Sequence, residues 1–381
     1  MIGLISLVND SASEMIYPLV PLYLASVLMA GPRALGIIEG IAEATASLLK
    51  LFSGVVVDRT RRAKPWVVAG YALAGFARPL IALATSWPAV LTLRFADRVG
   101  KGLRTSPRDA LLAGSVDSDR RGLAFGLHRA MDNAGAVVGP LSAALLLGLG
   151  WSLREVILFA LLPAVLCLAL AAMLKEPEHA GPHQPKPRFS WRMDGMPLAF
   201  RRYLVVLALF TLGNSSNMFL LLRASELGLP QAQVPLAWAA VAFIAMLFST
   251  PLSALSDRVG RTRLLVAGWL AYGVFYLGLG LMPPNTPWLL FGLFAGYGVF
   301  MAATEGVEKA LVADLAPRAL LGTAFGWFNL TAGLLLLPAS LIFGELYQQA
   351  GALTAFGFSA ACALSAALLL PLWALRTRPK A

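Results

Sequence analysis

Long apolar stretches, each about the length of a membrane-spanning helix, alternate with short polar segments along the 381-residue chain. A helix crosses the hydrocarbon core of a bilayer with roughly 20 apolar residues. The spacing of the apolar stretches therefore predicts twelve transmembrane helices. The predicted spans are residues 2–28, 34–57, 66–86, 88–114, 121–148, 152–174, 200–224, 232–256, 264–283, 287–314, 320–347 and 352–375.

The composition agrees with this pattern. Hydrophobic residues make up 58% of the chain and charged residues 13%, whereas a soluble domain carries about 25% charged residues. We therefore expect an all-α integral membrane protein, whose partner along most of its surface is the lipid bilayer.

The net charge of +11 is a topology signal. Basic residues gather in alternate loops, and the intervening loops hold little beyond Arg33, Arg154 and Arg223. Because cytoplasmic loops are enriched in Lys and Arg, both termini are predicted to be cytoplasmic, and the number of spans must be even. This distribution removes the reason to expect nucleic-acid binding. The basic loop residues are Arg59, Arg61, Arg62, Lys64, Arg120, Arg121, Lys175, Lys186, Arg188, Arg192, Arg201, Arg202, Arg258, Arg261, Arg263, Arg318, Arg376, Arg378 and Lys380.

The sequence gives no support for catalytic or cofactor chemistry. Its two cysteines, Cys167 and Cys362, both lie in apolar stretches and support neither a disulfide framework nor a metal site. It contains no G-x-S-x-G nucleophile elbow, no phosphate-binding glycine loop and no metal-ligand cluster. We expect no enzyme, no cofactor and no metal. We also expect no cleavable signal, because Asn9, Asp10 and Glu14 interrupt the first apolar stretch.

The two halves of the chain resemble each other. DRTRRAK at 58–64 recurs as DRVGRTR at 257–263, and ALLAGSVDSDRRGLAFG at 110–126 recurs as ALVADLAPRALLGTAFG at 310–326. Two matches at nearly the same offset indicate an internal duplication, and duplicated halves are how many transporters build a site near the bilayer midplane. We predict a six-helix half at 1–174, a polar, proline-rich cytoplasmic loop at 175–199 and a second six-helix half at 200–381.

The chain resembles the major facilitator superfamily over essentially its full length. GVVVDRTRRAK at 54–64 is similar to the superfamily's loop signature between spans two and three, although Val56 and Arg61 replace a small residue and a glycine. The resemblance implies two pseudo-symmetric six-helix bundles and loops that control the conformational switch. Anchoring by positive charge alone would explain the arginines but not the repeated aspartate. The implied gating residues are Asp58, Arg59, Arg62, Asp257, Arg258 and Arg261.

Two further motifs resemble the drug:proton antiporter subgroup. Gly135, Gly139 and Pro140 in span five match its G-x-x-x-G-P signature, and residues 18–21 match the P-x-x-P of span one. Small residues four apart let helices approach closely, so ordinary helix packing is the alternative interpretation. The equivalent segment of span eleven, residues 332–340, lacks the glycine pair. This asymmetry agrees with the antiporter resemblance.

Span four carries charges on one helical stripe that includes Asp97, Arg98, Lys101 and Arg104. Charges near mid-membrane are costly unless they have partners or face a wet interior, which makes them functional candidates. Residues 98–102, RVGKG, resemble the superfamily's R-x-x-Q-G signature, which is associated with proton coupling, with lysine in place of glutamine. So basic a stripe favours an anionic or metal-chelating solute. The alternative is an internal ion-pair network using Asp97, Asp109, Asp132 and the carboxylates of span one.

The remaining site candidates are polar residues in four other predicted spans. In span one, Asp10 and Glu14 share a helix face, and a carboxyl there could take up and release the coupling proton. Elsewhere the candidates for substrate binding or proton coupling are Arg129, Asp132, Asn214, Asn217 and Glu305.

Together these features predict a secondary transporter, and most directly a proton-coupled exporter of a small organic molecule working by alternating access. An uptake system for an organic anion and a non-transporting receptor or scaffold are the alternatives. The expected partners are a small-molecule substrate, protons and the bilayer, with the chain acting as a monomer in the cell's inner membrane.

Overall fold

The structure is a computed structural model that describes residues 1–60, 63–114, 121–174, 193, 195–317 and 320–375, although a few side chains within these ranges are not described. The described part is helical and contains no strand. Its helices are α1 Ile2–Ile16, α2 Leu19–Ser26, α3 Pro32–Thr60, α4 Lys64–Leu80, η1 Ile81–Leu83, α5 Trp87–Gly114, α6 Arg121–Gly148, α7 Leu153–Phe159, α8 Leu161–Ala172, α9 Leu198–Gly213, α10 Met218–Glu226, α11 Val234–Val259, α12 Arg261–Leu281, α13 Pro287–Leu315, α14 Leu321–Leu369 and η4 Leu370–Ala374.

Each of the twelve predicted spans coincides with one helix, or with two consecutive helices, of the structure. Span one breaks between α1 and α2, where Pro18 lacks the N–H that a continuous helix would use. Span seven breaks between α9 and α10 at residues 214–217. Predicted spans eleven and twelve run together as α14, but Gly351 lies between them with φ +84°, a conformation that favours glycine. The predicted fold class is confirmed.

Seven helical segments of the described chain are long and apolar enough to cross a membrane on those grounds alone. The α3 and α5 helices are also long enough, but they carry several charged side chains within their length. In a membrane protein such charges have to face the protein interior, where other polar groups can satisfy them. The charged helices α3 and α5 therefore indicate where the polar interior of the protein lies.

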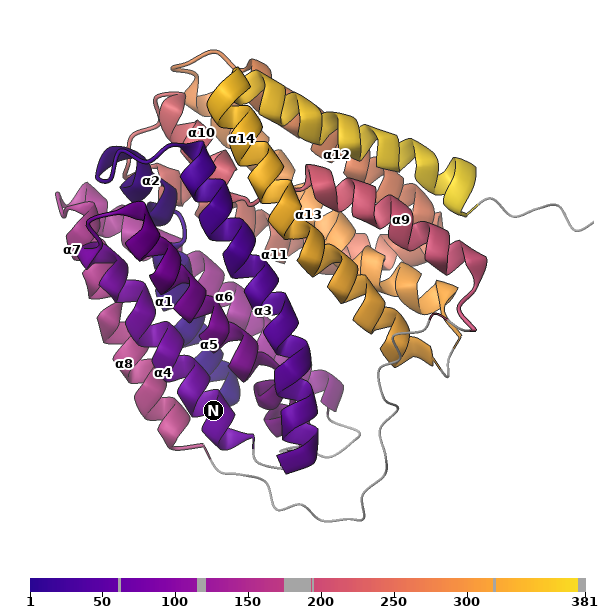
Figure 1. Ribbon diagram of the computed structural model, residues 1–381, viewed down its shortest axis with the longest axis horizontal. Helices are drawn as coiled ribbons and strands as arrows, with labels where there is room; N and C mark the ends of the chain where they lie inside the picture. Colours follow the sequence, from indigo (N-terminus) through magenta and orange to yellow (C-terminus); the bar gives the residue numbers. More distant parts are fainter. Residues whose placement is uncertain (61–62, 115–120, 175–192, 194, 318–319, 376–381) are drawn as a thin grey trace, which may run out of the picture.

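The helices form two groups that follow the sequence (Figure 1). In the N-terminal group, α1 packs on α6 and α8, and α5 packs on α3 and α4. In the C-terminal group, α14 packs on α9 and α12, and α13 packs on α11 and α12. We call these groups the N-terminal half and the C-terminal half. The domain boundaries at 174 and 199 stay a prediction, because most of the central loop lies outside the described residues.

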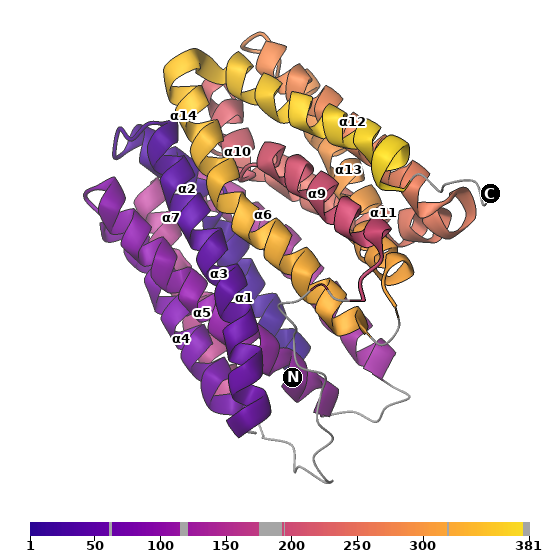
Figure 2. The same cartoon turned by 45° about the vertical axis from the view of Figure 1, so that its right-hand side comes forward.

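The halves touch mainly through three pairs of helices, α3 with α14, α6 with α11, and α2 with α10, and α10 also contacts α3. They meet at the end where α2 and α10 lie and diverge toward the end that carries the N-terminus (Figures 1 and 2). On the α3–α14 seam a Cβ added at Gly36 would lie 2.3 Å from the carbonyl oxygen of Ser340, and one added at Gly344 would lie 2.8 Å from that of Pro32. The seam is therefore a contact of backbone against backbone.

Candidate functional site

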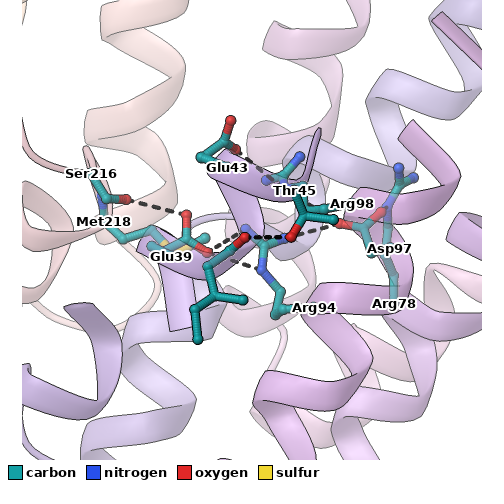
Figure 3. Close-up of polar contacts among 10 residues, drawn as sticks. Glu39, Glu43, Thr45, Arg78, Arg94, Asp97, Arg98, Ser216 and Met218 are labelled. Carbon is teal, nitrogen blue, oxygen red and sulfur yellow. Dashed lines mark hydrogen bonds and ion pairs between the residues drawn. The ribbon is translucent and has the colours of Figure 1, made fainter. Parts of the chain in front are cut away.

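A buried ion-pair network occupies the centre of the N-terminal half (Figure 3). Asp97 of α5 lies at its centre and is fully buried. Its Oδ1 accepts from Arg78 Nε of α4 at 2.7 Å, and its Oδ2 accepts from Arg94 Nη1, one turn away on α5, at 3.2 Å. Each of these charges is below 5% exposed, so the pairs have little competition from solvent.

Glu39 of α3 extends the network to the C-terminal half. Its Oε1 accepts from Arg94 Nη2 at 2.6 Å and from Arg94 Nε at 3.0 Å. Its Oε2 accepts from Ser216 Oγ at 3.2 Å. Ser216 lies in the α9–α10 link, residues 214–217, so a carboxylate of one half bonds to the non-helical segment of the other (Figure 3).

Arg98 forms the edge of the network, where its Nε lies 3.2 Å from Glu43 Oε1 of α3 and 3.9 Å from Asp97 Oδ2. Glu43 is partly exposed, whereas Arg98 is buried. Three arginines, Arg78, Arg94 and Arg98, thus face three carboxylates. Matching charges in this way limits the desolvation cost of burying them.

The sequence interpretation missed half of this network. Glu39, Glu43 and Arg78 lie inside the predicted spans 34–57 and 66–86, and a charge inside a span was a signal that could have found them. The alternative of an ion-pair network named Asp97, which does belong to it. It also named Asp109 and Asp132, but Asp109 pairs with Arg108 and Asp132 lies beside His128.

The first helix supplies two carboxylates beside the network. Asn9 links the first of them, Asp10, to the network, because its Oδ1 accepts from Arg78 Nη1 at 3.1 Å while its Nδ2 donates to Asp10 Oδ1 at 2.7 Å. One turn further along, Glu14 Oε2 accepts from Trp238 Nε1 of α11 at 3.0 Å. The Trp238 ring also lies 5.3 Å from the ring of Tyr17. Glu14 therefore bonds across the two halves, as Glu39 does.

The glycine motif of span five lies against this part of α1. A Cβ added at Gly135 would lie 2.7 Å from the carbonyl oxygen of Leu7 and 2.9 Å from Asp10 Cβ. One added at Gly139 would lie 2.5 Å from the carbonyl oxygen of Ser11. Pro140 follows within α6 and is buried. The two glycines thus allow α6 to approach the turns of α1 that carry the carboxylates.

Lys101 and Arg104 continue the stripe of α5 beyond Arg98. Lys101 is half-buried, and the guanidinium of Arg104 lies 4.4 Å from the ring centre of Tyr71. Past them, Ser6 Oγ lies 2.8 Å from His128 Nε2, and His128 Nδ1 lies 3.5 Å from Asp132 Oδ2. The side chain of Arg129 is outside the described residues. Asp132 is therefore part of a second polar group, separate from Asp97.

In the C-terminal half, the candidates gather at the break in span seven. Asn217 Oδ1 accepts from the Tyr297 hydroxyl at 2.6 Å, and Asn214 is half-buried at the end of α9. Glu305 of α13 is exposed. Asn214 and Asn217 are the first and last residues of the link that reaches Glu39.

The predicted gating loops are described only in part. The side chains of Asp58, Arg59, Arg62 and Asp257 lie outside the described residues, and Arg258 is exposed. Arg261, at the first position of α12, forms an ion pair of 2.5 Å with Asp314 in the last turn of α13.

Two helical halves with polar groups bonded between them are the arrangement that many membrane transporters share. The chain belongs to the Major Facilitator Superfamily, whose sequence model matches residues 2–222 and again residues 203–381. An uncharacterized MFS-type transporter of Methanocaldococcus jannaschii is 34% identical and aligns over 97% of this chain and 93% of the relative. Multidrug resistance protein MdtH of Salmonella newport is 26% identical over 83% of this chain and 78% of its own length.

Solved structures share the fold. The nucleoside transporter NupG has a TM-score of 0.77 at 14% identity, with 97% of both chains covered. The peptide transporter POT in complex with sulfate has a TM-score of 0.79 at 13% identity, with 97% of this chain and 92% of that chain covered. At these identities the likeness extends to the fold alone. The protein is a multi-pass membrane protein with the transporter fold of its superfamily.

Proposed function

We propose that the protein is a proton-coupled secondary transporter that exports a small organic molecule, anionic or metal-chelating, by alternating access. In this proposal the two halves rock about a site between them, and a proton gradient supplies the energy. The protein acts as a monomer in the cell's inner membrane with both termini in the cytoplasm.

The observation that carries the proposal is the hydrogen bond from Trp238 to Glu14, at 3.0 Å across the two halves. A carboxylate accepts a hydrogen bond more strongly than a neutral carboxylic acid does. Protonation of Glu14 therefore weakens a bond between the halves. By linkage, any rearrangement that breaks this bond changes the affinity of Glu14 for the proton. A residue that couples transport to protons needs this link between its own protonation and the contact of the two halves.

Two further observations support export. The glycines of the antiporter motif lie against the turns of α1 that carry Asp10 and Glu14. One relative carries the name multidrug resistance protein. An anionic solute is supported by the cationic side chains of Arg98 and Lys101 on α5.

The proposal can be tested by flux in proteoliposomes with an imposed pH gradient and a panel of anionic, cationic and metal-chelating solutes. We expect gradient-dependent flux of a solute from the anionic or chelating group, directed opposite to the protons. Glu14→Gln should abolish its dependence on the gradient. Glu155→Gln is the matched control, because Glu155 is an exposed cap of α7 and glutamine can also fill that role. Gradient dependence that survives in a folded Glu14→Gln protein would refute the coupling role.

A second candidate is uptake of an organic anion together with protons. Glu14 acts electrostatically on Lys101 and Arg98. A neutralised Glu14 therefore leaves these cations freer to bind an anion, so that proton and anion favour each other's binding. Flux of the anion in the same direction as the protons would select this candidate. The absence of flux for every solute would instead favour a receptor or scaffold.

A further inference from the structure

Two lysines beside the ion-pair network carry charges that the network does not neutralise. They are Lys50 of α3 and Lys101 of α5, and both are half-buried. The three arginines of the network already face its three carboxylates. Among the residues that the structure describes, neither lysine ammonium forms a hydrogen bond or an ion pair. The region therefore carries an excess of two positive charges.

The packing of α3 against α5 holds the two lysines near each other. A Cβ added at Gly102 would lie 2.5 Å from Leu49 Cβ, so only glycine allows this approach of the helices. Ser53 Oγ donates to the carbonyl oxygen of Gly102 at 2.8 Å, and Ser106 Oγ donates to that of Lys50 at 2.8 Å. The charge of Lys50 acts on Lys101 as a result.

Arg98 belongs to the same cationic group. It lies one turn before Lys101 on α5, and its charge acts on both lysines. Its Nε is buried and has no hydrogen-bond partner among the described residues, since the nearby Glu43 oxygen lies outside bonding geometry. From the other half, the exposed Lys309 of α13 also acts electrostatically on Lys50.

Like charges gathered at membrane depth are costly unless an anion neutralises them. Glu14 is the further carboxylate whose charge acts on Lys101 and Arg98. It provides one negative charge against Lys50, Lys101 and also Arg104, whose buried Nε has no hydrogen-bond partner among the described residues and whose charge acts on Lys50. The protein's own carboxylates therefore leave this group undercompensated, and a bound solute can supply the missing charge.

We propose that Lys50, Lys101 and Arg98 form a binding site for a small organic dianion, with Lys309 facing it from the C-terminal half. A dicarboxylate and a phosphate monoester share this chemistry. Two negative charges match the two positive charges that remain once Glu14 is counted against Lys50, Lys101 and Arg104, whereas a monoanion leaves one of them unneutralised. The inference deepens the proposed function, since it rests on a solute binding between the halves, and it assigns Lys50 and Lys309 to the site.

The test is isothermal titration of the purified full-length protein in detergent with succinate, methyl phosphate and acetate at constant ionic strength. The pH should lie about one unit above the second phosphate pKa of roughly 6, so that methyl phosphate is mostly a dianion while the lysines keep their charge. We expect at least one dianion to bind roughly tenfold or more tightly than acetate. Lys50→Gln and Lys101→Gln should each weaken that binding by about tenfold or more, the usual effect of losing a charge-assisted hydrogen bond.

Two controls separate charge at the site from folding and from overall charge. Arg154→Gln removes one positive charge from an exposed position on α7 and should leave binding unchanged. Lys101→Arg keeps the charge and should retain the preference for the dianion. Gel filtration and thermal unfolding check that each variant is folded.

The outcomes are distinct. Binding of succinate alone identifies a dicarboxylate site, and binding of methyl phosphate alone identifies a phosphate-monoester site; both support the inference. Equal affinity for acetate and the dianions, no binding of either dianion, or wild-type binding by folded Lys50→Gln and Lys101→Gln would overturn it. Because no pH gradient is present, the coupling proposal can fail while dianion binding persists, and the reverse also holds.

Discussion

The close contact of α6 with α1 gives a quantitative prediction for Gly139→Ala. The added Cβ would lie 2.5 Å from the carbonyl oxygen of Ser11 and 2.7 Å from the backbone nitrogen of Met15. To restore ordinary contact, the two helices must separate by roughly 1 Å. Overpacking of this kind costs about 1–3 kcal/mol, against a gain of up to about 1 kcal/mol from replacing glycine with alanine in a helix. We expect a net loss of up to about 2 kcal/mol.

Thermal unfolding of the purified protein measures this loss, and flux in proteoliposomes measures its effect on transport. Gly296→Ala on α13 is the matched control, because a Cβ at that position meets nothing within 4 Å. The control should be as stable as the wild type or more stable. Gly139→Ala should be less stable and should transport more slowly, since α1 carries Asp10 and Glu14. If the two variants are equally stable, the glycine motif does not serve close approach and the reasoning fails.

Three further predictions concern charged residues. Asp97→Asn should destabilise the protein by about 3–5 kcal/mol, because buried arginines lose their counter-charge. Glu345→Gln should cost at most about 1 kcal/mol, since its ion pair is exposed. Denaturation of both variants compares their stability, and equal losses would contradict the prediction. Asp58→Asn should impair transport while membrane insertion stays intact, and normal flux by the folded variant would reject its gating role. Asp10→Asn should reduce gradient-driven flux more than solute binding, so unchanged gradient dependence would count against Asp10 as a coupling group.

The fold was largely predictable from the sequence because length and hydropathy determine where a chain can cross a membrane. Each predicted span holds a helix, and the conformation of Gly351 separates the last two. The break at residues 214–217 was harder to predict. Asn and Ser compete for backbone hydrogen bonds in any helix, and Ser216 Oγ accepts from the nearby Met218 N, but its carboxylate partner Glu39 comes from the neighbouring half.

The candidate site was predictable in its residue types and only partly in its members. Asp97 and Arg98 stand out on a single helix, because a stripe of charges is visible in one stretch of sequence. Their partners Glu39, Glu43 and Arg78 come from α3 and α4. A pairing between helices depends on how they pack and on their rotation, which hydropathy does not encode. The same limit applies to Trp238, whose bond to Glu14 joins residues 224 positions apart.

The bond between Ser216 and Glu39 has a mechanical consequence. On one side of the contact, ion pairs tie α3, α4 and α5 together, so this side resists deformation. On the other side lies a four-residue link that interrupts the helix and keeps backbone hydrogen bonds at its two ends, from Asn214 N to Phe210 O and from Phe219 N to Ser216 O. When two bodies of unequal stiffness press on each other, the softer one yields. Relative tilting of the halves should therefore concentrate its strain in residues 214–217, and the rigid helices on either side should move with little change in shape.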